Sequence, residues 1–215
     1  MVAGRVISYG GIAIITQEQT PDGSSQNSPS EECLWCNEKP DFDGTITMGS
    51  LFDGIGGFPL AAVHCGVLPL WASEIESFPI AVTKTRFPYM VHMGDITKLN
   101  GAELPPVSII CGGSPCQDLS VAGARAGLAG ERSGLFMEQV RITKEMRNAD
   151  ISRGRTGVFV RPRYLCWENV PGAFSSGEIK GEDFRVVLEE IIRIKFDSVY
   201  VSRSFTRRWE PAGRI

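Results

Sequence analysis

The residues best suited to covalent chemistry lie in the segment Cys111-Gly-Gly-Ser-Pro-Cys-Gln-Asp-Leu-Ser120. The apolar run at 107–111 predicts a buried strand, and Pro115 fixes φ directly before Cys116. A thiol that follows such a strand stands at the carboxyl edge of a parallel sheet, where ligands bind. Cys116 is therefore a candidate nucleophile. The alternative, a cysteine that serves as a small buried hydrophobic residue, suits three others better: Cys65, Cys111 and Cys166.

A second segment has the composition of a ligand-binding turn. Leu51-Phe-Asp-Gly-Ile-Gly-Gly-Phe58 places three glycines where a strand is expected to turn into a helix. Glu74 ends the next predicted strand, at the position of a ribose-binding carboxylate, and Asp95 follows the third. The glycine spacing differs from the dinucleotide fingerprint, and no Gly-Lys-Ser/Thr is present, so the pattern favours an adenosyl group without a polyphosphate. For either carboxylate, the alternative is an exposed residue at a strand end.

The elements that must position these residues alternate between short apolar runs and helix-like stretches, which is typical of parallel βαβ units. The fold class is therefore α/β, a doubly wound and mostly parallel sheet. We expect strands at 46–52, 67–74, 91–96, 107–111, 163–168 and 198–201. We expect helices at 59–65, 79–87, 135–146 and 184–194, with a glycine-rich loop at 112–134 and an Arg/Gly-rich connection at 148–162.

The N-terminal residues 1–44 are predicted to form an arm or linker before a catalytic core at 45–215. Residues 6–15 resemble a short hairpin interrupted by two glycines, whereas residues 17–44 are polar, acidic and rich in Pro and Ser. Cys33 and Cys36 have the spacing of half a zinc site, but no second pair follows, so two free thiols are the simpler interpretation. No metal site is predicted.

Composition and charge narrow the functional classes. The chain has 215 residues, 42% hydrophobic, with no apolar run of the roughly 18 residues that a membrane span requires. Six cysteines and the absence of a convincing secretory signal favour a soluble protein in the reducing cytoplasm. The net charge of −3 divides into −8 for residues 1–140 and +5 for residues 141–215. The basic part either faces phosphate or forms a solvated helix face and a basic loop.

Taken together, the motifs resemble the DNA (cytosine-5) methyltransferase family over roughly residues 46–200. They are Phe-x-Gly-x-Gly-Gly at 52–57, Glu74, Gly-Asp-Ile at 94–96, Gly-Ser-Pro-Cys-Gln at 113–117 and Trp-Glu-Asn-Val at 167–170. The resemblance implies a Rossmann-like fold of the S-adenosylmethionine-dependent methyltransferase type that lacks its C-terminal part.

Residue roles follow from the resemblance. Cys116 is implied to be the nucleophile and Glu168 its acidic partner. Substrate-binding residues are implied at Pro115, Gln117, Ser120 and Asn169. S-adenosylmethionine is implied to bind at Phe52, Gly54, Ile55, Gly56, Gly57, Glu74, Ile75, Asp95, Ile96 and Leu135, with Ile75 against the adenine and Leu135 closing the methionine end.

The chemistry that the resemblance implies is methyl transfer to carbon 5 of cytosine in double-stranded DNA. The Cys116 thiolate adds to carbon 6, and Glu168 stabilises the charge at nitrogen 3, so that carbon 5 becomes able to attack the methyl group. The base must leave the stack to be reached. Basic residues near Arg125, Arg132 and 141–163 are expected to hold the DNA backbone.

The sequence departs from the family pattern after the Trp-Glu-Asn-Val segment at 167–170. The Gln-x-Arg-x-Arg segment, the target-recognition region and the final Gly-Asn helix are not found in these residues. Three hypotheses follow: a catalytic part that needs a second polypeptide for recognition, a truncated inactive fragment, or a non-catalytic nucleic-acid-binding remnant. An RNA substrate stays open. The Asp/Asn/Ser-Pro-Pro-aromatic segment of amine-directed methyltransferases is absent, which disfavours that class.

Overall fold

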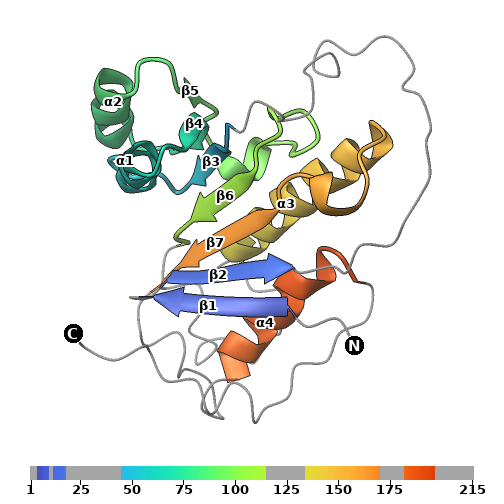
Figure 1. Ribbon diagram of the computed structural model, residues 1–215. Helices are drawn as coiled ribbons and strands as arrows, with labels where there is room; N and C mark the ends of the chain where they lie inside the picture. The colour runs from blue at the N-terminus through green and yellow to red at the C-terminus, as the bar shows by residue number, and fades with distance from the viewer. Residues whose placement is uncertain (1–3, 10–11, 18–44, 115–133, 170–181, 197–215) are drawn as a thin grey trace.

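One mixed sheet organises the protein in the computed structural model, which describes residues 4–9, 12–17, 45–114, 134–169 and 182–196. Its order is β1-β2-β7-β6-β3-β4-β5 (Figure 1). The strands are β1 Gly4–Tyr9, β2 Ile12–Gln17, β3 Thr47–Leu51, β4 Leu68–Ser73, β5 Val91–His92, β6 Ile109–Gly112 and β7 Tyr164–Glu168. The helices are α1 Gly57–His64, α2 Ser77–Arg86, α3 Gly134–Ser152 and α4 Glu182–Arg193, with short 3-10 turns η1 Ile96–Lys98 and η5 Gly157–Phe159.

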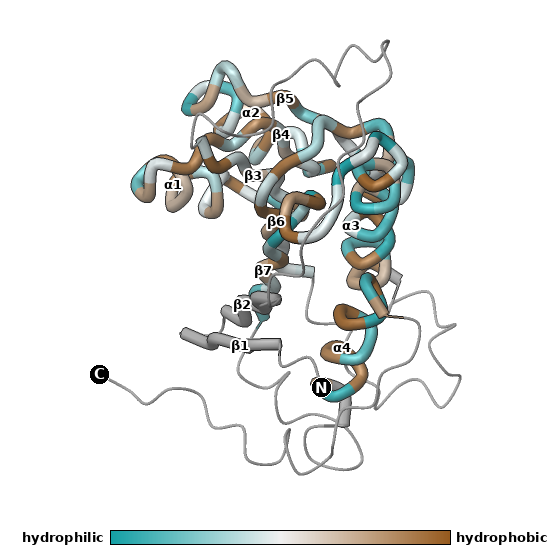
Figure 2. The backbone as a smooth tube through the Cα atoms, turned by 45° about the vertical axis from the view of Figure 1, so that its right-hand side comes forward, coloured by the Kyte–Doolittle hydropathy of each residue, from teal (hydrophilic) through white to brown (hydrophobic). Residues whose placement is uncertain are grey.

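The five strands from β7 to β5 pair in parallel, so the predicted doubly wound α/β sheet is confirmed. Helices α1 and α2 lie on one face, and α3 and α4 lie on the other (Figures 1 and 2). Side chains alternate between these layers. Ile110 joins the core beneath α3 and α4, while its neighbour Cys111 joins the smaller cluster that includes Ala62 of α1.

The larger core is built around Trp167 of β7. Its ring stacks on Phe184 of α4 at 6.3 Å and meets Phe136 of α3 edge-on at 5.9 Å, so one strand residue fixes both helices. Helix α4 buries Val187, Leu188 and Ile191 on the same side. This packing holds the end of β7, including Glu168 directly after Trp167, in a defined place.

Strands β1 and β2 form the predicted hairpin, and that prediction is confirmed. The sequence assigns these residues to the N-terminal arm, but β2 pairs antiparallel with β7 and extends the same sheet. The parallel part would otherwise end at β7 with unpaired backbone groups, and the hairpin satisfies them. Residues 18–44, with Cys33 and Cys36, lie outside the described residues.

Most predicted elements are confirmed to within a few residues, two differ in length, and one cysteine differs in burial. Helix α3 continues to Ser152 into the expected connection, because the buried Asp150 of its last turns accepts a hydrogen bond from the Arg161 backbone N–H at 2.8 Å. Strand β5 has two residues rather than six.

Cys65 is exposed, which contradicts the expectation of a buried thiol there, because it lies at the C-terminal end of α1. Cys111 and Cys166 are buried as expected. The strand expected at 198–201 lies outside the described residues.

Candidate active site

The carboxyl ends of the parallel strands form one edge of the sheet. Strand β3 ends at Leu51, β4 at Ser73, β6 at Gly112 and β7 at Glu168, with β3 between β4 and β6 in the sheet order. Turn-forming residues follow three of these strand ends: Asp53 and Gly54 after β3, Gly113 and Ser114 after β6, and Asn169 after β7. The turn after β3 and the carboxylates after β4 and β7 therefore meet along this edge, where ligands bind in such folds.

The glycine-rich turn after β3 depends on left-handed backbone conformations. Gly54 and Gly56 have φ of 56° and 85°, and the non-glycine Phe52 has φ of 54°. At Gly56 a Cβ atom would also lie 2.9 Å from Thr83 Cγ2, so both the left-handed φ and this close approach disfavour a larger residue. Gly57 begins α1 directly afterwards. At Gly54 and Gly57, a Cβ would meet no described atom within 4 Å, so the turn presents open backbone at the surface.

Glu74 ties this turn to the end of β4. Its Oε2 accepts a hydrogen bond from the Gly54 N–H at 2.8 Å. Its Oε1 accepts from the N–H groups of Ile75 and Glu76, at 2.7 and 3.0 Å. A carboxylate has about four acceptor positions, so three are used here and one remains for a ligand hydroxyl.

Asp53 is a further carboxyl group in the turn, and sequence reasoning missed it. It is 4% exposed, its Oδ1 accepts from Ser50 Oγ at 2.6 Å, and its buried Oδ2 has no hydrogen-bond partner among the described residues. Burial, opposed by the Ser50 hydrogen bond and assisted by the charge of Glu74, raises its pKa to about 6. The signal that could have found it is an acidic residue inside a glycine-rich turn.

Exposed apolar side chains surround Glu74. Ile75 is 68% exposed and Phe78 74%, and Ile55 of the turn is also exposed. Large apolar groups left in water beside a carboxylate with a spare acceptor position make a surface that suits a heteroaromatic base with an attached sugar. Two other predicted cofactor residues lie differently. Ile96 is a core residue at 4% exposure, and Leu135 at the start of α3 is partly buried against the same core.

Asp95 follows β5 and caps η1. Its Oδ1 accepts from the backbone N–H and the hydroxyl of Thr97, at 3.0 and 2.8 Å, and Lys98 lies 3.5 Å from Oδ2. The Thr97 hydrogen bonds, with a smaller contribution from Lys98, lower its pKa, so the carboxylate is charged. The Asp95 side chain is 33% exposed just after the strand and keeps room for a further donor.

Glu168 lies at the end of β7, exposed and directly beside the loop that leaves β6. A Cβ atom on Gly113 would fall 2.5 Å from Glu168 Oε2, so only glycine permits this approach. Gly112 and Trp167 are register partners one residue earlier, which explains the contact. Asn169 is buried. The predicted nucleophile and its neighbours, Pro115, Cys116, Gln117 and Ser120, lie outside the described residues.

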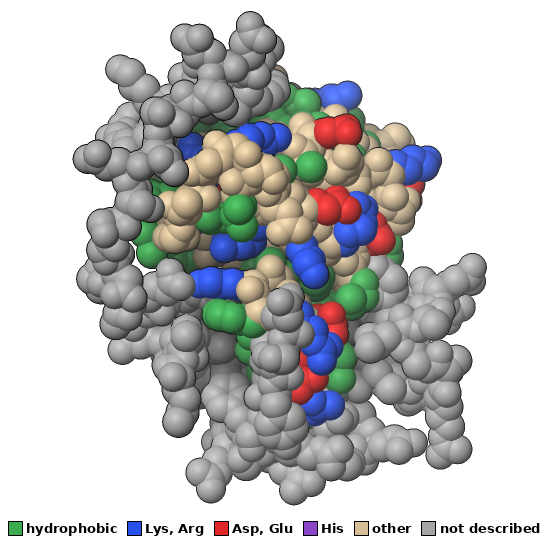
Figure 3. All heavy atoms as spheres, turned by 90° about the vertical axis from the view of Figure 1, so that its right-hand side faces the viewer, with side chains coloured by type: hydrophobic (Ala, Val, Ile, Leu, Met, Phe, Trp, Pro, Cys, Tyr) green, Lys and Arg blue, Asp and Glu red, His purple; other side chains and the backbone are tan. Residues whose placement is uncertain are grey.

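The basic residues of the C-terminal part are largely engaged within the protein. Arg141 donates to Glu138, to Glu145 and to the Leu99 carbonyl oxygen. Arg161 pairs with the buried Asp150 at 3.2 Å. Basic and acidic side chains are interleaved on the side of α3 and α4 (Figure 3). Nearby carboxylates therefore already pair with these two arginines, and the expectation that 141–163 holds a DNA backbone stays a prediction.

None of the helices among the described residues combines the length and apolar composition of a membrane span. In the same part of the chain, no group of three or more His, Cys, Asp or Glu side chains is arranged to hold a metal ion.

Comparison with known proteins places the chain. The profile of the C-5 cytosine-specific DNA methylase family matches residues 46–201. The chain is 39% identical over 137 residues to a protein named DNA N-6-adenine-methyltransferase from Escherichia phage P1, covering 62% of this chain and 18% of that protein. It is 32% identical over 162 residues to type II methyltransferase M1.ScrFI of Lactococcus lactis subsp. cremoris, covering 74% and 37%. It is 35% identical over 97 residues to M.HhaI of Haemophilus parahaemolyticus, covering 45% and 29%.

A solved structure described as a DNA modification methyltransferase from an Escherichia coli prophage shares the fold, with a TM-score of 0.50 at 24% identity over 70% of this chain and 38% of that one. The sheet and its helix layers thus define a Rossmann-like fold of the methyltransferase type. Because the profile match covers most of the chain, this protein belongs to the C-5 cytosine-specific DNA methylase family. It spans 18–37% of the lengths of the three relatives named above.

Proposed function

We propose that this chain is the catalytic part of a DNA (cytosine-5) methyltransferase, which transfers a methyl group from S-adenosylmethionine to a flipped-out cytosine. The observation that carries the proposal is the contact of Glu168 with Gly113, three residues before Cys116 in the chain. At no more than roughly 3.6 Å per residue, the chain itself limits how far residue 116 can be from this carboxylate. The glycine turn and Glu74 end at the same edge of the sheet.

The described residues fit S-adenosylmethionine. Glu74 has an acceptor position for a ribose hydroxyl, and Ile75 offers an exposed apolar surface for the adenine. Gly54 leaves open space above the turn, where the methionine part is proposed to lie near Asp53. When bound, the group supplies an electrophilic methyl on a sulfonium. Ile96 and Leu135 contribute through the backbone and the packing that supports the site.

Carbon 5 of cytosine is too weak a nucleophile to accept a methyl group unaided. The Cys116 thiolate forms a bond to carbon 6, and the π electrons of the 5,6 double bond move toward carbon 5 and the ring. Glu168, carrying or sharing a proton with nitrogen 3, stabilises that charge. Carbon 5 then takes the methyl group, loses its proton to a base, and the returning electrons expel the thiolate.

The target base must leave the duplex, since stacking covers both faces of carbon 6; this costs a few kcal/mol. Glu168 is exposed at the sheet edge and therefore accessible to an extruded base. Pro115, Gln117, Ser120 and Asn169 are proposed to line the substrate side of this site.

The adenine amine is the second candidate target, because one relative is named for N6-adenine methylation. The alignment covers only 18% of that protein, and the chain lacks the Asp/Asn/Ser-Pro-Pro-aromatic segment that an amine-directed enzyme uses. The Pro-Cys-Gln segment and Glu168 serve carbon-directed chemistry instead, so cytosine is the proposed target.

Trapping on 5-fluorocytosine tests the proposal. Fluorine at carbon 5 cannot leave as a proton does, so the thioether to carbon 6 persists after methylation. We expect the wild-type chain, given S-adenosylmethionine, to form a denaturation-resistant complex with a single-stranded oligonucleotide that contains 5-fluorocytosine, since an unpaired base needs no extrusion. Cys116→Ser should abolish the complex.

Cys65→Ser is the matched control, because Cys65 is a second, exposed free thiol away from the sheet edge. It should be trapped as the wild type is. Survival of the complex in Cys116→Ser would identify another nucleophile, and absence of any wild-type complex would remove catalysis from this chain.

A further inference from the structure

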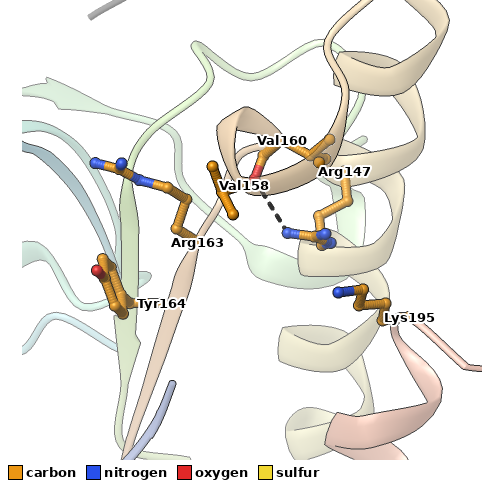
Figure 4. Close-up of a pocket in the computed structure, with 7 residues that line it drawn as sticks. Arg147, Val158, Val160, Arg163, Tyr164 and Lys195 are labelled. Atoms are coloured by element: carbon orange, nitrogen blue, oxygen red, sulfur yellow. Dashed lines mark hydrogen bonds between the residues drawn. The ribbon is translucent and has the colours of Figure 1, made fainter. Parts of the chain in front are cut away.

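A second concave site lies at the opposite edge of the sheet from the candidate active site. A cavity of about 180 Å³ opens beside Tyr164, where β7 begins, whereas Glu168 ends that strand roughly 13 Å further on. Its lining comes from α3, η5, the start of β7 and the residues after α4 (Figure 4). These lining residues are Arg147, Gly157, Val158, Val160, Arg163, Tyr164 and Lys195.

The cavity concentrates positive charge. Three of its residues are Arg or Lys, and none of the described residues that line it is acidic. The charged ends of Arg147 and Lys195 face one another on the helix side (Figure 4). The Arg163 side chain lines the other side with its aliphatic part, and its guanidinium points away from these two and lies 5.8 Å over the Tyr164 ring. Burial, and then repulsion from Arg147, lower the pKa of Lys195, and burial lowers the pKa of Arg147.

Among the described residues, no unpaired carboxylate lines this cavity. Asp150 is the acidic residue whose charge acts on Arg147, but it is fully buried and already paired with Arg161 at 3.2 Å. Elsewhere in this protein, arginines such as Arg141 have carboxylates in direct contact. The cavity therefore differs from the other basic positions in holding like charges together beside empty space, an arrangement that an anion would stabilise.

The donors also point to a ligand. Arg147 donates to the carbonyl oxygens of Val160 and Pro162, which fix its guanidinium at the cavity wall. A guanidinium and an ammonium beside one another match the oxygens and double charge of a phosphate better than a single carboxylate.

We propose that this cavity binds a phosphate group, with Arg147 and Lys195 as its ligands. Val158 gives the cavity an apolar wall, so the phosphate fits either as the free ion or as an ester. The two sources of that chemistry are a small phosphate compound and the backbone of a nucleic acid. The site is separate from the proposed methyl-transfer residues and stands whether or not they are active.

Thermal unfolding of the full chain in inorganic phosphate, against sodium chloride of equal ionic strength, tests the proposal. A ligand that binds only the folded state raises the melting temperature in proportion to RT ln(1 + [L]/Kd). We expect a phosphate-specific rise, and at least a fivefold weaker phosphate affinity in Lys195→Gln and in Arg147→Gln. Lys144→Gln is the matched control, because it removes an exposed cation from the same helix as Arg147, away from the cavity. It should keep the wild-type affinity.

A measurement on the unmutated protein guards against misfolded variants. Phosphate should slow acylation of Lys195, measured by mass spectrometry, and leave that of Lys144 unchanged. No rise beyond that in chloride, or equal losses in the control variant, would overturn the proposal. Duplex DNA that displaces phosphate, and that binds Lys195→Gln more weakly, would identify the nucleic-acid backbone as the source. Phosphate binding that DNA does not compete for would identify a small phosphate compound.

Discussion

Glu74 joins two functions in one side chain, since it fixes the glycine turn and offers an acceptor to a ligand. Glu74→Ala should weaken S-adenosylmethionine binding by about 1–3 kcal/mol, as expected for losing hydrogen bonds to a charged group. Calorimetric titration measures this loss. Glu76→Ala removes an exposed carboxylate two residues later and should bind normally. Unchanged affinity in Glu74→Ala would remove this residue from the site.

Asp53 makes stability depend on pH. Its pKa of about 6 exceeds the ordinary aspartate value of 3.8, so between these values the folded state holds a proton that the unfolded state has released. Stability therefore falls as pH rises through this window, by up to roughly 3 kcal/mol at about 1.4 kcal/mol per pKa unit. Asp53→Asn should abolish this fall. Urea unfolding between pH 4 and about 8 checks it; a wild-type and variant difference that is constant with pH would contradict the assignment.

At the scale of single residues, motif spacing predicts side chains whose role depends on their position after a strand. It does not predict side chains whose properties depend on burial in the folded protein. Glu74 follows from its place after the second predicted strand. Asp53 does not, because its raised pKa depends on packing and on Ser50. Likewise, Cys111 and Cys166 face one another across β6 and β7, while Cys65 is at the surface. Hydrophobic periodicity predicts that Cys111 and Cys166 are buried. The exposure of Cys65 depends on its position at the end of α1.

At the scale of elements, the contact between the β6 loop and β7 decides where the carboxylate lies. Gly113→Ala would place a Cβ 2.5 Å from Glu168 Oε2, and the carboxylate must move. We expect at least a tenfold loss of methyl transfer, since small displacements of a catalytic group carry large penalties. The affinity for S-adenosylmethionine should be unchanged, because the glycine turn lies on β3. Equal losses in binding and transfer would indicate a general folding defect instead.

Element boundaries were predictable where glycine and proline mark them, and unpredictable where distant contacts decide. Gly66 has φ of 71° and ends α1 as expected, and α4 follows the apolar spacing of Phe184, Val187 and Leu188. Helix α3 runs past its expected end because Asp150 is held by Arg161, eleven residues later. The pairing of β2 with β7 joins residues more than 150 positions apart, which no local pattern encodes.

At the scale of the whole molecule, the sheet separates two kinds of chemistry. Its carboxyl edge holds the glycine turn, Glu74 and Glu168, and its amino edge holds the basic cavity around Arg147. The arginines expected to hold DNA are partly engaged within the fold, as Arg141 and Arg161 show. We therefore propose that duplex recognition comes from polypeptide outside these residues, consistent with relatives of which the matched part makes up only 37% and 29%.

If duplex recognition comes from other polypeptide, the chain alone should favour an unpaired target base. Without recognition polypeptide, the chain must extract a paired cytosine unaided, at a penalty of a few kcal/mol, whereas a mismatched or unpaired cytosine largely avoids it. We expect methyl incorporation from labelled S-adenosylmethionine to be on the order of 100-fold faster on the unpaired base, since about 1.4 kcal/mol corresponds to a factor of ten. Adding the C-terminal segment of a relative such as M1.ScrFI should narrow that ratio by accelerating the paired substrate. Equal rates on both substrates with the chain alone would show that these 215 residues already contain what base extraction requires.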